Sequence, residues 1–250
     1  MERVLKIKRI KNPKFSIIIP TLNEEKYIEN TLLSIKWQNF DLPYEIIVSD
    51  SNSKDKTIEI AKKYANKIVI TNKKGIALGR NLGAKYAEGE YLLFVDADTI
   101  LLPNALKEIY KEIKRKKVTL VSLPVLPSEF DMTILLYYAF YDVFSKTTVK
   151  LKNPQIAGMV ICCKRKDFIQ VGGFNEEYNI VEDYDFSSKI GKLGEVKIVD
   201  LSLALTSPRR ILKWGKLNGA VKYLLLYIAY VSGIKKLVNK LGSSIYKPVR

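Results

Sequence analysis

Short apolar runs alternate with segments of helical periodicity along the first 123 residues of the chain. Continuous runs such as 15–19 and 91–95 are rich in β-branched and aromatic residues, which is typical of strands buried on both faces. Between these runs, apolar side chains recur every three or four positions, as Ile28, Leu32 and Ile35 do. This alternation predicts a mostly parallel α/β sheet flanked by helices. The expected strands are 15–19, 44–49, 67–70, 91–95 and 118–123, and the expected helices are 24–37, 56–64, 79–87 and 103–114.

The pattern is less regular after residue 123. Residues 130–144 are rich in aromatics, and residues 214–241 have the pattern of a long basic and apolar helix with a break at Gly233. No repeat or linker divides the chain, so we expect one α/β domain over residues 1–210 with a C-terminal helical extension over residues 211–250. The other elements expected here are helices at 164–170 and 182–190 and a strand at 195–199.

The composition limits the chemistry that the chain can perform. It has 42 Lys and Arg against 26 Asp and Glu, a net charge of +16. A field of this sign attracts nucleotide diphosphates, nucleic acid or an anionic membrane, without choosing among them. The chain contains no His, so proton transfer falls to carboxylates, Lys, Tyr or Cys.

The two cysteines, Cys162 and Cys163, are adjacent in an apolar run. Neighbouring side chains of a strand point to opposite faces, so the pair is poorly placed to bind one metal ion and we expect core residues. The chain shows no disulfide framework, and its basic first 14 residues lack an apolar signal segment. We therefore expect a cytoplasmic protein.

Polar side chains follow three of the expected strands, at the edge of the sheet where open α/β folds bind ligands. Residues 20–24 follow the first strand, Asp50 follows the second, and Asp96 and Asp98 follow the fourth. Two carboxylates at this spacing suit one cation, or a cation and a ribose, and Mg²⁺ prefers such oxygens together with substrate phosphates. Because Asp-x-Asp pairs are common in loops, the position after a buried strand is what supports a site here.

Four sequence segments, continued by three weaker ones, have the order and spacing of a known family. The strong segments are IIIPTLNEE (17–25), IIVSDSNSKDKT (46–57), GRNLGA (79–84) and AEGEYLLFVDAD (87–98). The weaker ones are GGF (172–174), EDYD (182–185) and SPRR (207–210). Together they resemble a family 2 glycosyltransferase over about residues 15–210. The resemblance implies the GT-A fold, a Rossmann-like sheet flanked by helices.

The resemblance also implies a role for each matched residue. Asp183 would be the general base, with Glu182 beside it. Asp98 would bind a divalent cation, Mg²⁺ or Mn²⁺, and Asp96 would lie near the ribose or the metal. Asn81 would support the neighbouring loop. The donor nucleotide would contact Pro20, Thr21, Glu24, Asp50, Arg80 and Asp96.

These roles describe an inverting glycosyltransferase that moves a sugar from a nucleotide-diphosphate sugar to a hydroxyl of a glycan or lipid-linked glycan. A cation stabilises the leaving diphosphate, and a carboxylate accepts the proton of the hydroxyl. The family often has a second Asp after Asp50, where this chain has Ser51, so the identity of the base stays open. Arg209 and Arg210 are either solvated charges or a clamp on a donor diphosphate or acceptor phosphate.

Three other functions stay open from the sequence. A polyprenyl-phosphate sugar transferase of the same family would use a lipid phosphate as acceptor and need little base catalysis. A nucleotidyltransferase would usually carry a glycine-rich basic loop after the first strand, unlike residues 20–24. A basic nucleic-acid-binding protein fits the charge alone, and since no known nucleic-acid motif is present we expect no nucleic-acid partner.

The apolar segment 223–230 is too short to cross a bilayer and is flanked by Lys222, Lys235 and Lys236. It fits a helix packed on the domain or in a dimer, or an interfacial helix with aromatics at headgroup level. The Lys-rich flanks and the net charge favour peripheral contact with an anionic membrane, on its cytoplasmic face. The aromatics near Tyr137 would add to that surface or line an acceptor cleft. The oligomeric state stays open.

Overall fold

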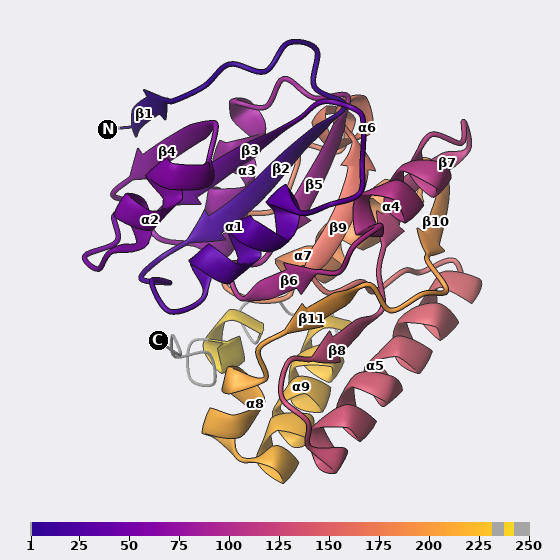
Figure 1. The fold of residues 1–250 in the computed structure, drawn as a ribbon. Coiled ribbons are helices and arrows are strands. Elements are labelled where there is room, and N and C mark those ends of the chain that lie inside the picture. The colour runs from indigo at the N-terminus through magenta and orange to yellow at the C-terminus, as the bar shows by residue number, and fades with distance from the viewer. Residues whose placement is uncertain (1, 232–237, 243–250) are drawn as a thin grey trace.

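A central sheet of eight strands forms the middle of the molecule (Figure 1). The computed structural model describes residues 2–231 and 238–242. Four neighbouring strands run parallel, as predicted, and one strand on their flank is antiparallel to both of its neighbours. The spatial order is β1 (Glu2–Lys6), β4 (Lys67–Thr71), β3 (Tyr44–Asp50), β2 (Phe15–Thr21), β5 (Tyr91–Val95), β9 (Val160–Lys164), β7 (Val118–Ser122) and β10 (Glu195–Ile198). The parallel strands are β4, β3, β2 and β5, and the antiparallel one is β9.

The strand register brings the polar segments of the sequence together. Phe15 pairs with Tyr44 and Thr21 with Asp50, so β2 and β3 end at the same level. On the other side of β2, β5 is also parallel, and its carboxyl end opens at the same edge of the sheet. The loops that follow these strands therefore meet at one edge, as ligand-binding loops do in open α/β sheets.

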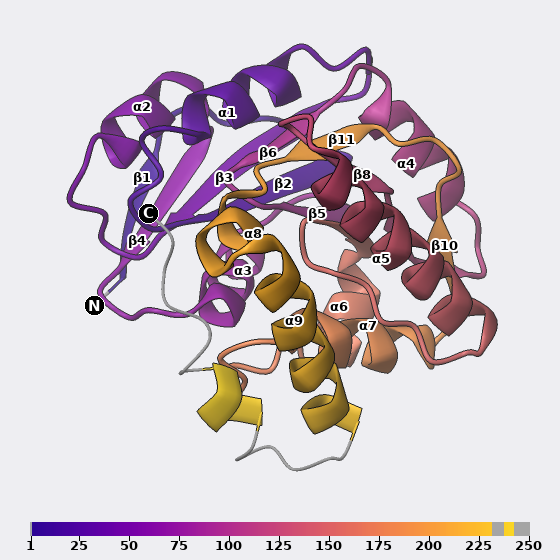
Figure 2. The same ribbon diagram turned by 90° about the horizontal axis from the view of Figure 1, so that it is seen from below.

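Helices cover both faces of the sheet because the buried strands alternate their side chains between two cores. On β2, Ile17 and Ile19 pack into one core and Ile18 packs into the other. Figure 2 shows the two helix layers with the sheet between them. The first core is covered by α1 (Ile28–Lys36), α2 (Thr57–Tyr64) and α4 (Ala105–Ile113), and the second by α3 (Ile76–Lys85), α6 (Arg165–Gln170) and α7 (Glu182–Gly191).

The adjacent cysteines confirm this alternation on β9. Cys162 belongs to the first core and Cys163 to the second, and both are free and fully buried. Burial raises the pKa of both thiols, which keeps them protonated at neutral pH. They are core residues, as expected.

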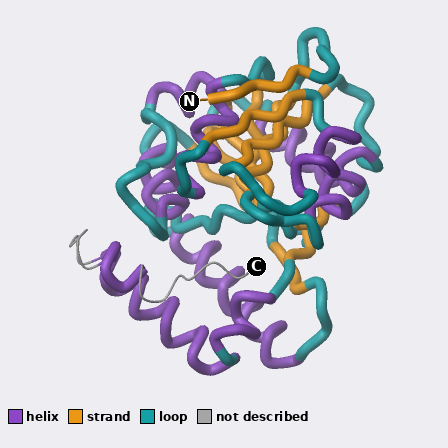
Figure 3. Tube along the Cα trace, turned by 90° about the vertical axis from the view of Figure 1, so that its left-hand side faces the viewer, coloured by secondary structure: helices purple, strands orange, loops and turns teal. Residues whose placement is uncertain are grey.

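A smaller sheet and three helices lie beyond the carboxyl edge of the central sheet (Figures 1 and 3). Phe144 and Tyr227, on two of these helices, contact each other with ring centroids 5.0 Å apart. Within residues 2–231 and 238–242, no helix is both long and apolar enough to cross a membrane. The small sheet has the order β6 (Thr99–Leu101), β11 (Ala204–Thr206), β8 (Val125–Pro127), and the helices are α5 (Met132–Lys150), α8 (Arg209–Trp214) and α9 (Lys216–Val231).

The helix expected over residues 24–37 begins only at Ile28. The chain before it forms turns, with Asn23 at a φ of 55°. The Glu24 N–H donates to Thr57 Oγ1 at 2.7 Å, so a side chain of the neighbouring loop satisfies a backbone group at this point. This arrangement keeps Glu24 at the edge of the sheet.

Helix α5 and the C-terminal helices also differ from the expectation. The aromatic segment 130–144 is apolar on every side, which hides the helical period, yet it forms most of α5. The helix expected over 214–241 is divided, because Gly215 with a φ of 82° separates α8 from α9. The expected break at Gly233 lies outside the described residues. The domain boundary after residue 210 falls within α8 and stays a prediction.

Candidate active site

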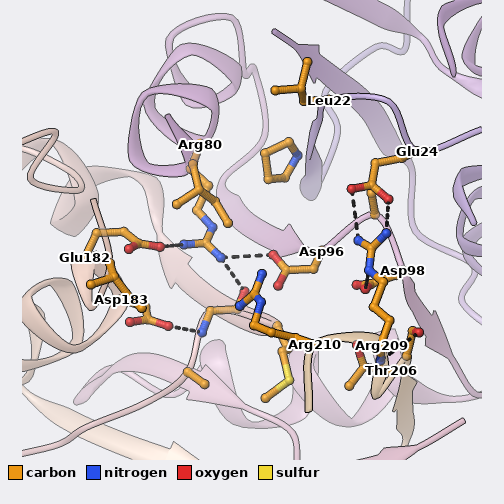
Figure 4. A pocket seen from close by; sticks show the side chains of 18 of the residues that line it. Leu22, Glu24, Arg80, Asp96, Asp98, Glu182, Asp183, Thr206, Arg209 and Arg210 are labelled. Carbon is orange, nitrogen blue, oxygen red and sulfur yellow. Dashed lines mark hydrogen bonds and ion pairs between the residues drawn. The ribbon is translucent and has the colours of Figure 1, made fainter. Parts of the chain in front are cut away.

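A pocket of about 420 Å³ opens where β2 and β5 end (Figure 4). Its walls come from eight segments, including one face of α5 and the start of α7. Most of the predicted site residues line it, whereas Asp50 and Asn81 do not. Those that line it are Pro20, Thr21, Glu24, Arg80, Asp96, Asp98, Glu182, Asp183, Arg209 and Arg210.

Arg80 links the two carboxylate groups of the pocket. Its side chain is 1% exposed and crosses from α3 to the carboxyl end of β5. Its Nη2 lies 3.0 Å from Asp96 Oδ1 and its Nη1 lies 2.7 Å from Glu182 Oε1. Nη2 also donates to the carbonyl of Gly158 at 3.1 Å. The guanidinium therefore holds a residue after β5 and a residue of α7 in fixed relative positions at the wall of the pocket, and its contact with the donor stays a prediction.

This buried cluster shifts the pKa values of its members. Burial lowers the pKa of the Arg80 guanidinium, but Asp96, Glu182 and Asp183 outweigh it, so Arg80 stays charged. Burial raises the pKa of Glu182 to about 7, helped by the neighbouring charge of Asp183 and opposed by Arg80. A buried pair of this kind is strongly destabilised when one partner is removed.

Asp183 lies beside Glu182 in the first turn of α7. Its Oδ2 accepts from the Gly158 N–H at 2.7 Å, and its Oδ1 accepts from the Tyr184 N–H at 2.9 Å. Burial raises its pKa, and the charge of Arg80 opposes the rise. The residue before the helix, Val181, has a φ of 62°, a conformation that β-branched residues rarely adopt. This strained residue directs the start of α7, with its two carboxylates, toward the pocket.

A second ion cluster lies on the other side of the pocket. Arg209 donates to both carboxylate oxygens of Glu24, at 2.8 and 2.9 Å, and its Nε lies 2.8 Å from Asp98 Oδ2. The guanidinium also lies over the ring of Tyr27, 4.5 Å from its centroid. Burial raises the pKa of Glu24 and of Asp98, and Arg209 opposes the rise in both. Arg209 is thus bound within the protein and is not a solvated charge.

Asp50 lies beneath the pocket instead of in it. It is fully buried, and its carboxylate accepts from Thr21 Oγ1 at 2.8 Å and from the N–H and hydroxyl of Ser53 at 2.7 and 2.6 Å. These bonds fix the loops after β2 and β3 against each other. Ser51, the residue that departs from the family pattern, lines the pocket.

Asn81 also acts from outside the pocket. Its Nδ2 donates to the Phe174 carbonyl at 2.8 Å, and its Oδ1 accepts from the Phe174 N–H at 2.9 Å. The Phe174 ring in turn lies 5.1 Å from the Arg80 guanidinium. Asn81 therefore supports the loop that packs against Arg80, which agrees with the supporting position expected for it.

Several pocket residues were not singled out from the sequence. The aromatics near Tyr137, expected on a membrane surface or in an acceptor cleft, are different: Tyr137, Tyr138 and Tyr141 line the pocket from α5. Gly158 carries the N–H that binds Asp183 and the carbonyl that binds Arg80. A Cβ at Gly158 would lie 2.1 Å from Arg80 Nη2, so only glycine fits here. A glycine directly before a strand is a weak signal for such close packing.

The donor atoms of Asp96 and Asp98 suit a divalent cation. Both carboxylates line the pocket, and Mg²⁺ or Mn²⁺ prefers oxygen ligands. In the described part of the chain, no three His, Cys, Asp or Glu side chains are grouped to hold a metal ion by themselves. A cation bound here would have these two carboxylates as ligands from the chain, with substrate oxygens and water at the other coordination positions, as is usual for Mg²⁺ at phosphate sites.

Comparison with known families agrees with this geometry. The family model described as glycosyl transferase family 2 matches residues 16–164, more than half of the chain. The chain belongs to glycosyl transferase family 2. A second model, described as the N-terminal domain of galactosyltransferase, matches residues 139–204 of this family 2 chain. Together the two matches extend over residues 16–204, from β2 through β10 and including the whole of α7.

Two relatives of this family 2 chain are named for poly(ribitol-phosphate) and for teichoic acid biosynthesis. Poly(ribitol-phosphate) beta-N-acetylglucosaminyltransferase TarS of Staphylococcus aureus is 42% identical over 102 residues, 38% of this chain and 18% of that protein. The minor teichoic acid biosynthesis protein GgaB of Bacillus subtilis is 31% identical over 186 residues, 69% of this chain and 20% of that protein. The chain thus spans about a fifth of the length of these two relatives.

Solved structures show the same fold. A mannosyltransferase from Pyrobaculum calidifontis, in complex with GDP-Man and Mn²⁺, has a TM-score of 0.68 at 22% identity, covering 94% of this chain and 71% of that one. S. aureus TarS in complex with UDP-GlcNAc has a TM-score of 0.60 at 25% identity, covering 78% of this chain and 58% of that one. The GT-A fold expected from the sequence is confirmed for this family 2 chain.

Proposed function

We propose that the protein is an inverting glycosyltransferase that moves a sugar from a nucleotide-diphosphate sugar to a hydroxyl of a glycan or lipid-linked glycan. One observation carries the proposal: a single pocket is lined on one side by Asp96 and Asp98, at the end of β5, and on another by Asp183, at the start of α7. The same cavity therefore has carboxylates for the donor diphosphate and its cation, and a carboxylate for the acceptor hydroxyl. The named relatives and the nucleotide-sugar complexes of similar folds support the assignment.

The donor would lie along the carboxyl ends of β2, β3 and β5. Pro20, Thr21 and Ser51 line this part of the pocket. Asp50 bonds to Thr21 and to Ser53 and so holds the loops after β2 and β3 together. Lys74, at the same wall, adds a positive charge for the diphosphate. Ser51 leaves the choice of nucleobase open.

A divalent cation, Mg²⁺ or Mn²⁺, would be held by Asp98 with Asp96. When bound, it would neutralise the charge that develops on the leaving diphosphate. The solved complexes of similar folds with Mn²⁺ support its presence. Arg209 and Arg210 line the same wall, so a bidentate guanidinium is available to the diphosphate once Arg209 leaves Asp98.

Asp183 would accept the proton of the attacking hydroxyl. Glu182 is engaged by Arg80, whereas each oxygen of Asp183 accepts one backbone N–H and retains a lone pair. The backbone bonds orient the carboxylate and keep it in place during proton transfer. One carboxylate in this position suits a single displacement with inversion.

The acceptor would enter between α5 and α8. Tyr137, Tyr138 and Tyr141 give this side an amphipathic aromatic wall of the kind that binds sugar rings and lipid-linked glycans. Residues 1–210 would form the transferase domain and residues 211–250 the helical extension. Peripheral contact of segment 223–230 with the cytoplasmic face of an anionic membrane is part of the same proposal. Lys235 and Lys236, expected to flank that segment, lie outside the described residues.

A panel of UDP-, GDP- and dTDP-sugars with Mn²⁺ tests the proposal. We expect the sugars of one nucleotide to raise the melting temperature of the protein. Without acceptor, the enzyme should slowly hydrolyse that nucleotide-sugar to free sugar and nucleoside diphosphate. The shift should depend on Mn²⁺ or Mg²⁺ and be lost in Asp98→Asn. If the full panel gives neither a thermal shift nor hydrolysis, the proposed donor is wrong.

A polyprenyl-phosphate acceptor would change the role of Asp183 and not that of the donor site. A phosphate nucleophile is already ionised at neutral pH and needs no base. Full transfer to a lipid phosphate by Asp183→Asn would establish that alternative.

A further inference from the structure

Helix α5 presents an apolar stripe to solvent on the side opposite the pocket. Met132, Leu136, Phe140 and Val143 recur at intervals of four, four and three residues, which places them on one face of the helix. Their exposed fractions are 60%, 63%, 71% and 62%. Such a contiguous apolar surface is uncommon on a soluble protein and marks a site of interaction.

The opposite face of α5 forms part of the pocket. Tyr138 is buried, and Tyr137 and Tyr141 are half-buried, all three lining the cavity. One helix therefore separates the pocket from the apolar stripe. The thickness of a helix with its side chains is about 10 Å, so the pocket lies roughly that far from whatever covers the stripe.

Helix α9, a neighbour of α5, also exposes apolar side chains. Val221, Leu225 and Ile228 recur at helical spacing and are 55%, 46% and 55% exposed. Phe144 of α5 and Tyr227 of α9 are in ring contact, so the two helices are neighbours. Figure 1 shows both helices below the central sheet.

The charges around this surface are mostly positive. The four residues of the stripe are apolar, while on the same helix Asp142 pairs with Lys146 at 2.7 Å. Lys150 and Lys152 are exposed at the C-terminal end of α5. Lys213 of α8 is exposed and Lys222 of α9 is half-buried beside Trp214. The acidic residues at the other end are Glu129 and Asp131, the latter capping α5.

A positive margin around an apolar surface selects between the partners that could cover it. A second copy of this face offers the lysines few opposite charges, since its acidic residues at the start of α5 are Glu129 and Asp131. An anionic lipid surface attracts the same lysines, and its acyl boundary accepts the exposed side chains. The apolar face and the charge therefore favour the same occupant.

We propose that the exposed faces of α5 and α9 dock on an anionic lipid membrane, which would lie about one helix thickness, ~10 Å, from a pocket that takes a lipid-borne acceptor. The lipid-borne acceptor rests on the proposed function. The docking rests only on the exposed surface of the two helices. It names α5 as the principal contact, in addition to the C-terminal segment expected from the sequence.

Vesicle co-sedimentation of the whole chain tests the docking. With vesicles of phosphatidylglycerol and phosphatidylcholine we expect binding that weakens as salt rises and is much weaker with phosphatidylcholine alone. The double variant Leu136→Glu/Phe140→Glu should bind at least tenfold less, since each side chain loses a favourable burial worth about tenfold in partitioning. Both residues are exposed and outside the pocket, so donor hydrolysis should be unchanged.

A matched variant, Trp37→Glu/Ile169→Glu, replaces two side chains that are 72% and 65% exposed on other elements. It should bind vesicles like the original chain. Equal vesicle binding by the two double variants would overturn the assignment of the surface, and no binding by the original chain would overturn the docking itself. A dimer in solution that Leu136→Glu/Phe140→Glu dissociates would show that a second copy covers the face. If the original chain binds vesicles but does not hydrolyse any donor, the proposed function is wrong and the docking still holds.

Discussion

Arg209 Nε lies 2.8 Å from Asp98 Oδ2, so the carboxylate proposed to hold the metal is paired with a cation of the protein itself. The same guanidinium binds both oxygens of Glu24. A metal ion and Arg209 cannot both neutralise Asp98 at the same oxygen. A cation that bound this oxygen would displace Arg209, and the displaced guanidinium could then contact the diphosphate.

Replacing Arg209 should tighten metal binding in the absence of donor. In Arg209→Ala, Asp98 loses a charge-assisted bond of about 1.5–3 kcal/mol, so we expect Mn²⁺ to bind roughly tenfold more tightly. Two partly buried carboxylates are then unpaired, so the melting temperature should fall without metal and recover with Mn²⁺. The KM for the donor should rise.

Titration calorimetry with Mn²⁺, thermal unfolding and donor kinetics measure these three effects. Lys213→Ala, an exposed residue of the same helix, is the control and should change none of them. Unchanged Mn²⁺ affinity in Arg209→Ala would show that Arg209 does not compete for Asp98.

Replacing the proposed base should abolish transfer without unfolding the protein. Asp183→Asn keeps the shape of the side chain but cannot accept a proton, so kcat should fall by about 10²–10⁴ with a hydroxyl acceptor while the KM for the donor is retained. The control is Asp185→Asn on the same helix, where Asp185 pairs with Lys189 at 2.6 Å. Transfer at the original rate by Asp183→Asn would remove it from the role of base.

The central sheet could be predicted because its strands are short, continuous apolar runs between segments of helical period. On β2 the alternation of Ile17, Ile18 and Ile19 between two cores requires helices on both faces. The three-residue strands β6, β8 and β11 were not predictable, because three residues show no period and their pairing depends on distant partners. Helix α5 was missed because its pocket face and its exposed face are both apolar.

The residue types of the site could also be predicted, but not all of their contacts. Asp96, Asp98 and Asp183 follow from position and family resemblance, and they line one pocket. Arg80 was expected to approach the donor, yet its guanidinium is turned to Glu182, 102 residues away in the sequence. Nothing local in GRNLGA indicates this partner. Contacts over such separations arise only when the tertiary fold brings α3 and α7 together.

Removing the charge of Arg80 should destabilise the protein far more than removing an exposed arginine. Arg80→Met leaves Asp96 and Glu182 without their cation in a buried site, for an expected loss of about 3–5 kcal/mol in the free energy of unfolding. Arg115→Met breaks an exposed pair with Glu112 and should cost less than about 1 kcal/mol. Urea unfolding at neutral pH measures both. Similar values for the two variants would mean that the Arg80 cluster contributes little to folding.

The raised pKa of Glu182 predicts a pH dependence of stability with a definite sign. Its pKa is 4.5 in the unfolded reference and about 7 in the folded protein, because burial disfavours the charged form. Between these values the native state holds a proton that the unfolded state releases, so raising the pH through this window destabilises the native state. The full change corresponds to about 3 kcal/mol, and below about pH 4.5 both states are protonated and the effect is constant.

Glu182→Gln removes this proton and should flatten the curve. Between pH 5 and 7.5, the unfolding free energy of the original chain should fall relative to that of the variant, which urea unfolding at several pH values can measure. Asp183 shares the buried site and its pKa is also raised by burial, so part of the slope should persist in Glu182→Gln and disappear in the double variant with Asp183→Asn. A difference between the original chain and Glu182→Gln that grows with pH in the opposite direction would show that Glu182 is ionised throughout this range, held by Arg80.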